Sequence, residues 1–256
     1  FHERGIRVGG EGRHKNAVQV ARERNFRDFR QDNILDTRQF QMAFRRLRQF
    51  SSRVDGSKTE LDIDATIDET CENAGNLRIV WDRPRKNTVK LLLMFDSDGS
   101  MMPYSNLCSH LFQAVSKSNH FKDLKVYYFH NCIYEHLYTT PYCKRGEWID
   151  TEWVLRNFSS EYKVIFIGDA SMAPSELMSK GGNNYVGLYN ETPGIEWLMR
   201  FKKKYSKQIW LNPIPEREWE YVNGRRTIET LRSTFPMYEL SINGLEAGIK
   251  KLLVSK

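Results

Sequence analysis

The sequence predicts an α/β protein whose core is a doubly wound, mostly parallel sheet with one antiparallel edge strand, preceded by a helical extension. After residue 88, short apolar runs alternate with helical patterns, which favours a parallel sheet covered by helices. Two of these runs, 124–129 and 133–138, are separated by only three residues, which is typical of a hairpin at a sheet edge. A charged turn around Pro84 separates the two parts. We therefore predict a basic, partly helical extension over residues 1–87 and an α/β domain over residues 88–256.

The extension carries most of the excess positive charge. Of the 256 residues, 39 are Lys or Arg and 32 are Asp or Glu, and residues 1–60 alone hold 14 and 8 of these. Phe40, Ala43, Phe44 and Leu47 recur with helical spacing after Asp36, a credible N-cap, which predicts an amphipathic helix. A second short helix is expected, with Asp64 or Thr66 as its N-cap and Gly75 at its end.

Three arginines, Arg45, Arg46 and Arg48, fall largely outside the apolar face of the first helix. They are candidate partner-binding residues, because a guanidinium group pairs with carboxylates in a bidentate manner. A docked helix with a solvated basic side is the competing interpretation. Nucleic-acid binding is not favoured, since no zinc-finger or aromatic strand pattern accompanies the basic residues.

The α/β domain is built from alternating segments. The expected strands are 89–95, 124–129, 133–138, 163–167, 208–211 and 237–242. The expected helices are 104–118, 150–158, 175–180, 194–205, 226–234 and 244–254.

The spacing of the cysteines and the length of the apolar stretches indicate the cellular compartment. The four cysteines show no spacing typical of a metal site, which favours free thiols in a reducing cytosol. No apolar stretch reaches the length of a membrane span, so we expect a cytoplasmic protein without a membrane contact. The chain begins at Phe1, which indicates a fragment.

Polar side chains gather where two predicted strands end. Asp96, Asp98 and Ser100 follow the strand 89–95, and Asp169 follows the strand 163–167. Because ligands bind at the carboxyl edge of open α/β sheets, these residues are expected to lie close together. Thr151 opens a helix and can contribute a hydroxyl. Oxygen ligands suit Mg²⁺, with Mn²⁺ or Ca²⁺ as alternatives.

This pattern resembles the metal-ion-dependent adhesion site of von Willebrand factor A (VWA) domains. The matching positions are Asp96 and Ser100 after the first strand, Thr151 in a second loop and Asp169 in a third. The resemblance implies that Ser100 and Thr151 bind the metal directly and that Asp96 and Asp169 bind it directly or through water. It also implies an open coordination position that accepts a carboxylate from a protein partner. Thr139 and Thr140 remain alternatives to Thr151.

Nearly the whole chain is similar to the CoxE-like group of bacterial VWA proteins. The similarity is carried by the segments 35–40 (LDTRQF), 44–48 (FRRLR), 168–172 (GDASM) and 210–213 (WLNP). It implies a non-enzymatic cytosolic adaptor whose partner is a MoxR-type AAA+ ATPase or that ATPase's client, in the assembly or maturation of another protein.

Asp98 departs from the adhesion-site pattern because it stands where a hydroxyl is expected. A carboxylate there either binds the metal more tightly or points away from it. Two other functions fit some of the residues. A nucleic-acid-associated protein would use the basic N-terminal arm, and a phosphatase of the haloacid dehalogenase type would use Asp96 as nucleophile. Phosphatases of that type also need a later Lys and an acidic pair on a third strand, and Gly168-Asp169 offers only one acid. No catalytic residue is therefore predicted.

Overall fold

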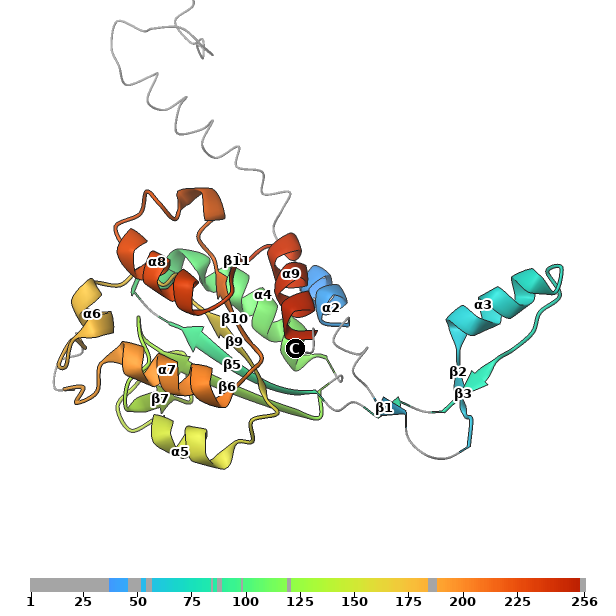
Figure 1. Cartoon of the computed structure of the whole chain (residues 1–256), viewed down its shortest axis with the longest axis horizontal. Helices are drawn as coiled ribbons and strands as arrows, with labels where there is room; N and C mark the ends of the chain where they lie inside the picture. The colour runs from blue at the N-terminus through green and yellow to red at the C-terminus, as the bar shows by residue number, and fades with distance from the viewer. Residues whose placement is uncertain are drawn as a thin grey trace, which may run out of the picture.

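A seven-stranded sheet forms the centre of the molecule (Figure 1). The computed structural model describes residues 37–45, 52–53, 57–83, 85–86, 89–97, 99–118, 121–183 and 188–253. The strands of the sheet run in the order β11-β10-β9-β5-β6-β7-β8. The five strands from β11 to β6 are parallel, whereas β7 and β8 are antiparallel to their neighbours. The predicted fold class is confirmed, and the antiparallel edge holds two strands.

The strands of the large sheet are β5 (Lys90–Asp96), β6 (Asp123–Phe129), β7 (His136–Tyr138), β8 (Trp148–Asp150), β9 (Lys163–Ile167), β10 (Gln208–Asn212) and β11 (Met237–Glu239). The helices are α2 (Thr37–Arg45), α3 (Ile63–Glu72), α4 (Ser105–Ser116), α5 (Thr151–Asn157), α6 (Pro174–Met178), α7 (Gly194–Lys204), α8 (Arg225–Thr234) and α9 (Ile242–Leu253). Short 3₁₀ helices are η3 (Gly99–Tyr104) and η4 (Glu216–Glu218). Two small ladders pair β1 (Ser52–Arg53) with β4 (Arg85–Lys86) and β2 (Glu60–Leu61) with β3 (Trp81–Asp82).

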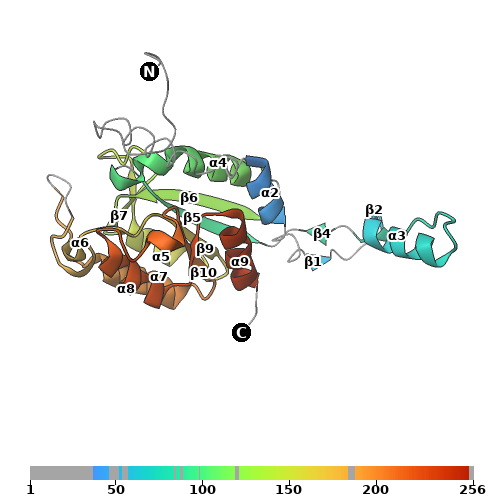
Figure 2. The same cartoon turned by 90° about the horizontal axis from the view of Figure 1, so that it is seen from above.

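The sheet has an apolar core on each face, because successive residues of a strand point to opposite sides. On β5, Leu91 and Leu93 belong to one core, and Leu92 and Met94 belong to the other. The first core is closed by α2, α4 and α9, and the second by α5, α7 and α8. Figure 2 shows α4 and α2 on one side of the sheet and α7 and α8 on the other. The strands are therefore nearly continuous apolar runs in the sequence, as buried parallel strands are.

Helix α2 is part of this packing. Phe40 and Phe44 are 0% exposed and lie in the same core as Leu91 and Leu93. The helix contacts α4 and α9. Its predicted apolar face is thus buried on the α/β body, while Leu47 and the proposed N-cap Asp36 lie outside the described residues. The boundary at residues 87/88 stays a prediction.

Residues 57–83 form a small unit, here called the projecting unit, that extends away from the sheet (Figures 1 and 2). It contains β2, α3 and β3. None of the residues of α3 is buried. Thr66 joins the helix to the returning segment, since its Oγ1 donates to the Asp62 carbonyl and accepts the Val80 N–H. The N-cap of α3 is Asp62, whose side chain accepts the Ala65 N–H, and neither Asp64 nor Thr66 caps the helix.

Most predicted elements of the body are within three residues of the observed ones. The strand expected over 237–242 ends at Glu239, and the strand expected over 133–138 begins only at His136. Strand β8, three residues long, was not predicted because so short a segment carries no alternating pattern. No described helix combines the length and the apolar character needed to cross a membrane.

Candidate functional site

Asp96 ends β5 at the carboxyl edge of the sheet and is only 4% exposed. Its Oδ1 accepts the N–H of Asn131 at 2.9 Å. Its Oδ2 is buried and has no hydrogen-bond partner within the described part of the chain. A buried carboxylate oxygen without a partner is costly, because the water that would solvate it has been removed. The position of Asp96 therefore suits a positively charged ligand.

The end of β9 brings a second carboxylate beside the first. Gly168 comes so close to Asp96 that a Cβ at position 168 would lie 2.7 Å from the Asp96 Cβ, so only glycine fits. The next residue, Asp169, is 3% exposed, and its Oδ1 accepts the Ser171 N–H at 2.8 Å. Ala170 follows with a positive φ of 56°, a conformation that L-residues rarely adopt. The Gly-Asp-Ala-Ser segment is thus a tight turn that places Asp169 at the end of β9.

Three side chains from the C-terminal half hold this turn. The Trp210 indole donates to the Gly168 carbonyl at 2.7 Å, and the Asn212 amide donates to the Asp169 carbonyl at 2.8 Å. From α8, the Thr227 hydroxyl donates to the Ala170 carbonyl at 2.8 Å. The sequence predicts a strand over 208–211 and a family signature over 210–213, and the structure adds that Trp210 and Asn212 fix the turn that carries Asp169.

Glu176 is a third carboxylate near the site, and the sequence did not single it out. It is 4% exposed, and its Oε2 accepts the Ala173 N–H at 2.8 Å. Its Oε1 accepts the side-chain amide of Asn131 at 2.8 Å. Asn131, held with a positive φ of 57°, therefore links Glu176 to Asp96. An acidic residue in the first turn of a short helix is the only signal for Glu176 in the sequence, and surface helices share it.

The acidic groups affect one another. Burial raises the pKa of Asp96 well above its ordinary value, and the negative charges of Asp169 and Glu176 raise it further. The backbone N–H groups of Asn131 and Ser97 act in the opposite direction. The ionised form of Asp96 is thus held in an unfavourable environment, which a cation would relieve.

The other predicted ligands lie in different settings. Ser100 is exposed within η3, and Asp98 lies outside the described residues. Thr151 is the first residue of α5 and is 0% exposed, with its hydroxyl donating to the Tyr134 carbonyl at 2.5 Å. The structure thus brings Asp96 and Asp169 together, whereas the hydroxyl and the backbone N–H of Thr151 donate to the carbonyls of Tyr134 and Glu135.

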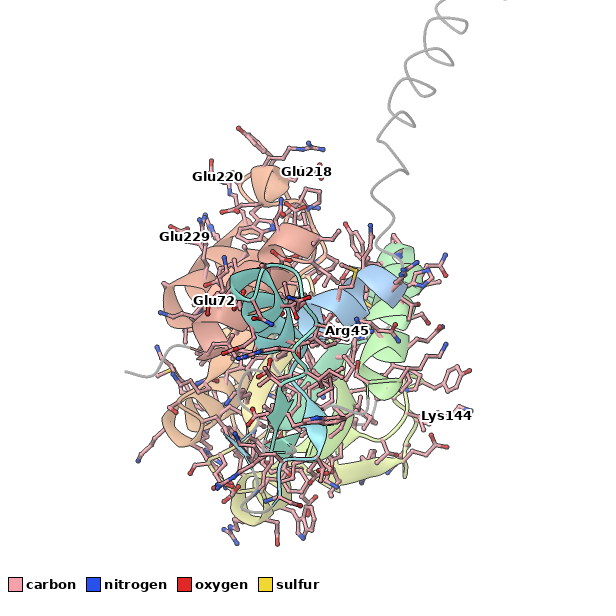
Figure 3. The ribbon with its side chains drawn as sticks, turned by 90° about the vertical axis from the view of Figure 1, so that its right-hand side faces the viewer. Arg45, Glu72, Lys144, Glu218, Glu220 and Glu229 are labelled. Carbon is pink, nitrogen blue, oxygen red and sulfur yellow. The ribbon has the colours of Figure 1, made fainter. Side chains whose placement is uncertain are left out.

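The alternative hydroxyls and the arginines can also be placed. Thr139 and Thr140 both bond to Glu147, through its carbonyl and its carboxylate. Arg45 is exposed at the end of α2 (Figure 3), and Arg46 and Arg48 lie outside the described residues. Within the described ranges, no group of three or more His, Cys, Asp or Glu side chains is arranged to hold a metal ion.

A cleft of about 660 Å³ opens beside Asp96. It lies between the η3–α4 segment and the loop at Pro141, and its lining is mostly apolar, including Met101, Met102 and Phe112. Met102 is 68% exposed. Asp96 therefore borders on a surface that a protein side chain can enter.

These residues fit a hard cation. The unpartnered Oδ2 of Asp96 and the adjacent Asp169 carboxylate are the oxygen donors that Mg²⁺ prefers, and Mg²⁺ needs few protein ligands because it retains several waters. Exposed Ser100 lies four residues after Asp96 and can supply a hydroxyl from η3.

The comparisons with known proteins point to one family for part of the chain. Residues 35–137 match the family model described as VWA domain containing CoxE-like protein. The matched range includes α2, the projecting unit and the body from β5 to β7, and it ends before Thr151 and Asp169. No curated protein and no solved structure matches the chain. The match and the VWA-like sheet together confirm the resemblance that the motifs predict, and residues 35–137 are similar to CoxE-like proteins with a VWA domain.

Proposed function

We propose that this protein is a metal-dependent, non-enzymatic adaptor that binds a protein partner at the carboxyl edge of its sheet. The coarser part follows from the family, because VWA domains mediate contacts between proteins. The observation that carries the finer part is the buried, unpartnered Oδ2 of Asp96 beside Asp169. A cation bound at these carboxylates would offset the unfavourable burial of the charged Asp96 side chain and would offer a binding position to the partner.

In this proposal Asp96 and Ser100 hold the cation and Asp169 supports it. Thr151 stays a candidate ligand, which requires that its hydroxyl turn from the Tyr134 carbonyl. Bound Mg²⁺, or Mn²⁺ or Ca²⁺ in its place, would supply a positive charge and an open coordination position for a partner's carboxylate. The cleft beside Asp96 would receive the residues that flank this carboxylate. Of the three arginines proposed to contact the partner, Arg45 is the one that lies among the described residues.

We also propose a MoxR-type AAA+ ATPase, or its client, as the partner. The support is the CoxE-like family itself. The nucleic-acid alternative depends on residues 1–60, most of which lie outside the described residues.

Metal binding is tested by titrating the metal-free protein with MgCl₂ in a calorimeter and by following its thermal unfolding. We expect Mg²⁺ to bind and to raise the midpoint of unfolding, since a ligand that binds only the folded state stabilises it. The variants Asp96→Ala and Asp169→Ala should lose this effect. Asp150→Ala, which removes an exposed carboxylate paired with His136, is the matched control and should keep it.

Partner binding is tested by co-purification with a MoxR-type AAA+ ATPase in the presence of Mg²⁺ or EDTA. Binding that requires Mg²⁺ and Asp96 supports both parts of the proposal. If binding persists in EDTA and in Asp96→Ala, the metal mechanism is wrong while the partner is correct. Hydrolysis of p-nitrophenyl phosphate that Asp96→Asn abolishes would instead show an enzyme.

A further inference from the structure

The projecting unit exposes large apolar side chains that its own fold leaves uncovered. On α3, Ile63 and Ile67 are 64% and 55% exposed, and they lie one helical turn apart. On the returning segment, Leu77, Ile79 and Trp81 are 71%, 52% and 50% exposed and alternate as residues on one side of an extended chain do. Large apolar side chains gathered on one small unit mark an interaction surface, whereas single exposed ones do not.

An acidic stripe runs along α3 beside this apolar stripe. Asp64, Asp68 and Glu72 follow one another at four-residue spacing, each one position after Ile63, Ile67 and Cys71. All three acids are exposed, and no ion pair joins them to any described residue. Figure 3 labels Glu72 on α3. The projecting unit holds seven acidic and three basic residues, a net charge of −4, although the whole chain has a net charge of +7.

The body carries a surface with the opposite charge and a similar apolar character. A shallow groove of about 610 Å³ lies along α7, lined by Ile195, Met199, Lys202 and Lys203 together with Glu196 and Arg200. The guanidinium of Arg200 is paired with Glu152, so three cations and one acid line the groove. Met199 is 45% exposed. Neither lysine forms an ion pair within the described residues. On α7, therefore, an apolar stripe leads into a basic end, the counterpart of the stripes on α3.

We propose that the projecting unit of one copy docks into the α7 groove of a second copy. Ile63 and Ile67 pack against Ile195 and Met199, while the acidic stripe of α3 faces Lys202 and Lys203. The apolar contacts supply the affinity and the charges set the orientation, as is usual at protein interfaces.

A contact between two copies is favoured over the other arrangements. Within one chain the projecting unit and α7 lie far apart in both views (Figures 1 and 2). Pairing two projecting units would bring a net charge of −4 against −4. Docking onto α7 instead joins opposite charges. Because two different surfaces meet, the contact is head-to-tail and generates rings or open chains of copies.

Charge exchange tests the proposal on the full-length chain by sedimentation velocity over a range of protein concentrations. We expect the wild type to self-associate, less strongly as salt is raised. Asp68→Lys/Glu72→Lys should weaken association about tenfold, and Lys202→Glu/Lys203→Glu should do the same. A mixture of these two variants should associate again, because each supplies the partner that the other has lost. A wild type that stays monomeric at every concentration, or a mixture that does not recover, overturns the proposal.

The native thiol Cys71 provides a second test. It is exposed on α3 in the apolar stripe. In a Met199→Cys variant, a short bismaleimide should join Cys71 of one copy to position 199 of another and yield covalent multimers. Tyr221→Cys, which places a thiol at an 83% exposed position outside α7, is the matched control and should not. Equal cross-linking in both variants would show random collision and contradict the docking.

Discussion

Helices α2 and α3 both precede the first strand of the large sheet, and the sequence predicts a short amphipathic helix in both places. The two helices differ in whether their apolar faces are buried. The apolar face of α2 is buried, with Phe40 and Phe44 0% exposed. The apolar face of α3 is open, with Ile63 and Ile67 more than half exposed. The first helix therefore stabilises the body, and the second is available to bind something else.

The difference shows what amphipathic spacing can and cannot tell. Spacing reveals that a helix has an apolar face, and it carries no information about which surface covers that face. The charge of each helix indicates which kind of surface can cover its apolar face. The described α2 has no acidic residue, whereas α3 has four in ten. An acidic helix next to an apolar stripe is suited to a basic partner surface rather than to a neutral core.

The largest expected effect separates the two helices by stability. Phe44→Ala should lower the free energy of unfolding by about 3–5 kcal/mol, because it leaves a cavity where α2 meets the body. Ile67→Ala should change it by no more than about 0.5 kcal/mol, since the side chain is 55% exposed. Urea unfolding of both variants measures the difference. Equal losses would mean that α3 also packs against the body in solution.

The turn that carries Asp169 should show the next largest effect. Asn212→Ala leaves the Asp169 carbonyl buried without its donor, and we expect a loss of about 1–3 kcal/mol. Asn157→Ala removes a similar amide-to-carbonyl bond, to Trp153, at an exposed position where water replaces it. Thermal unfolding should therefore separate these two variants. Mg²⁺ affinity should fall only in Asn212→Ala, because only that variant loosens the Asp169 turn.

One part of the candidate site was predictable from the sequence and another part was not. Asp96 and Asp169 were predictable because strand ends of a parallel sheet share one edge, and the ends of β5 and β9 are adjacent. Glu176 was not, because it reaches the site from a short helix through the unusual backbone of Asn131. A docked α2 was among the interpretations of the sequence, but the helices that cover Phe40 and Phe44 were not predictable. Helices α4 and α9 lie far away in sequence, and only the folded sheet brings them to α2.

Asp96→Asn tests whether the ionised Asp96 carboxylate destabilises the metal-free protein. The folded protein raises the pKa of Asp96, so it binds this proton more tightly than the unfolded chain does. Stability is then lost as the pH rises through the titration of Asp96. The metal-free variant escapes this loss and should be more stable than the metal-free wild type by on the order of 1 kcal/mol near neutral pH.

The control for Asp96→Asn is acidic solution, where the wild-type carboxyl is protonated and the difference between the two proteins should shrink. The variant should also no longer be stabilised by Mg²⁺. If the Asp96→Asn substitution destabilises the metal-free protein at neutral pH, then the ionised carboxylate is favourable at this position. The proposal that the site needs a cation would then be wrong.

The smallest effect on the body is expected from the largest deletion. The ladder between β1 and β4 pairs Ser52 with Lys86 and Arg53 with Arg85, so the chain leaves the body and returns to it at one place. Replacing residues 57–83 by a short Gly-Ser linker should therefore leave the unfolding midpoint of the body nearly unchanged. A two-stranded ladder with one helix has too little core to add stability to a larger domain.

The same deletion should abolish self-association, because the projecting unit is the only part removed. A body that unfolds at a much lower temperature after the deletion would show that the unit contributes to folding, and the contrast between α2 and α3 would then be one of degree.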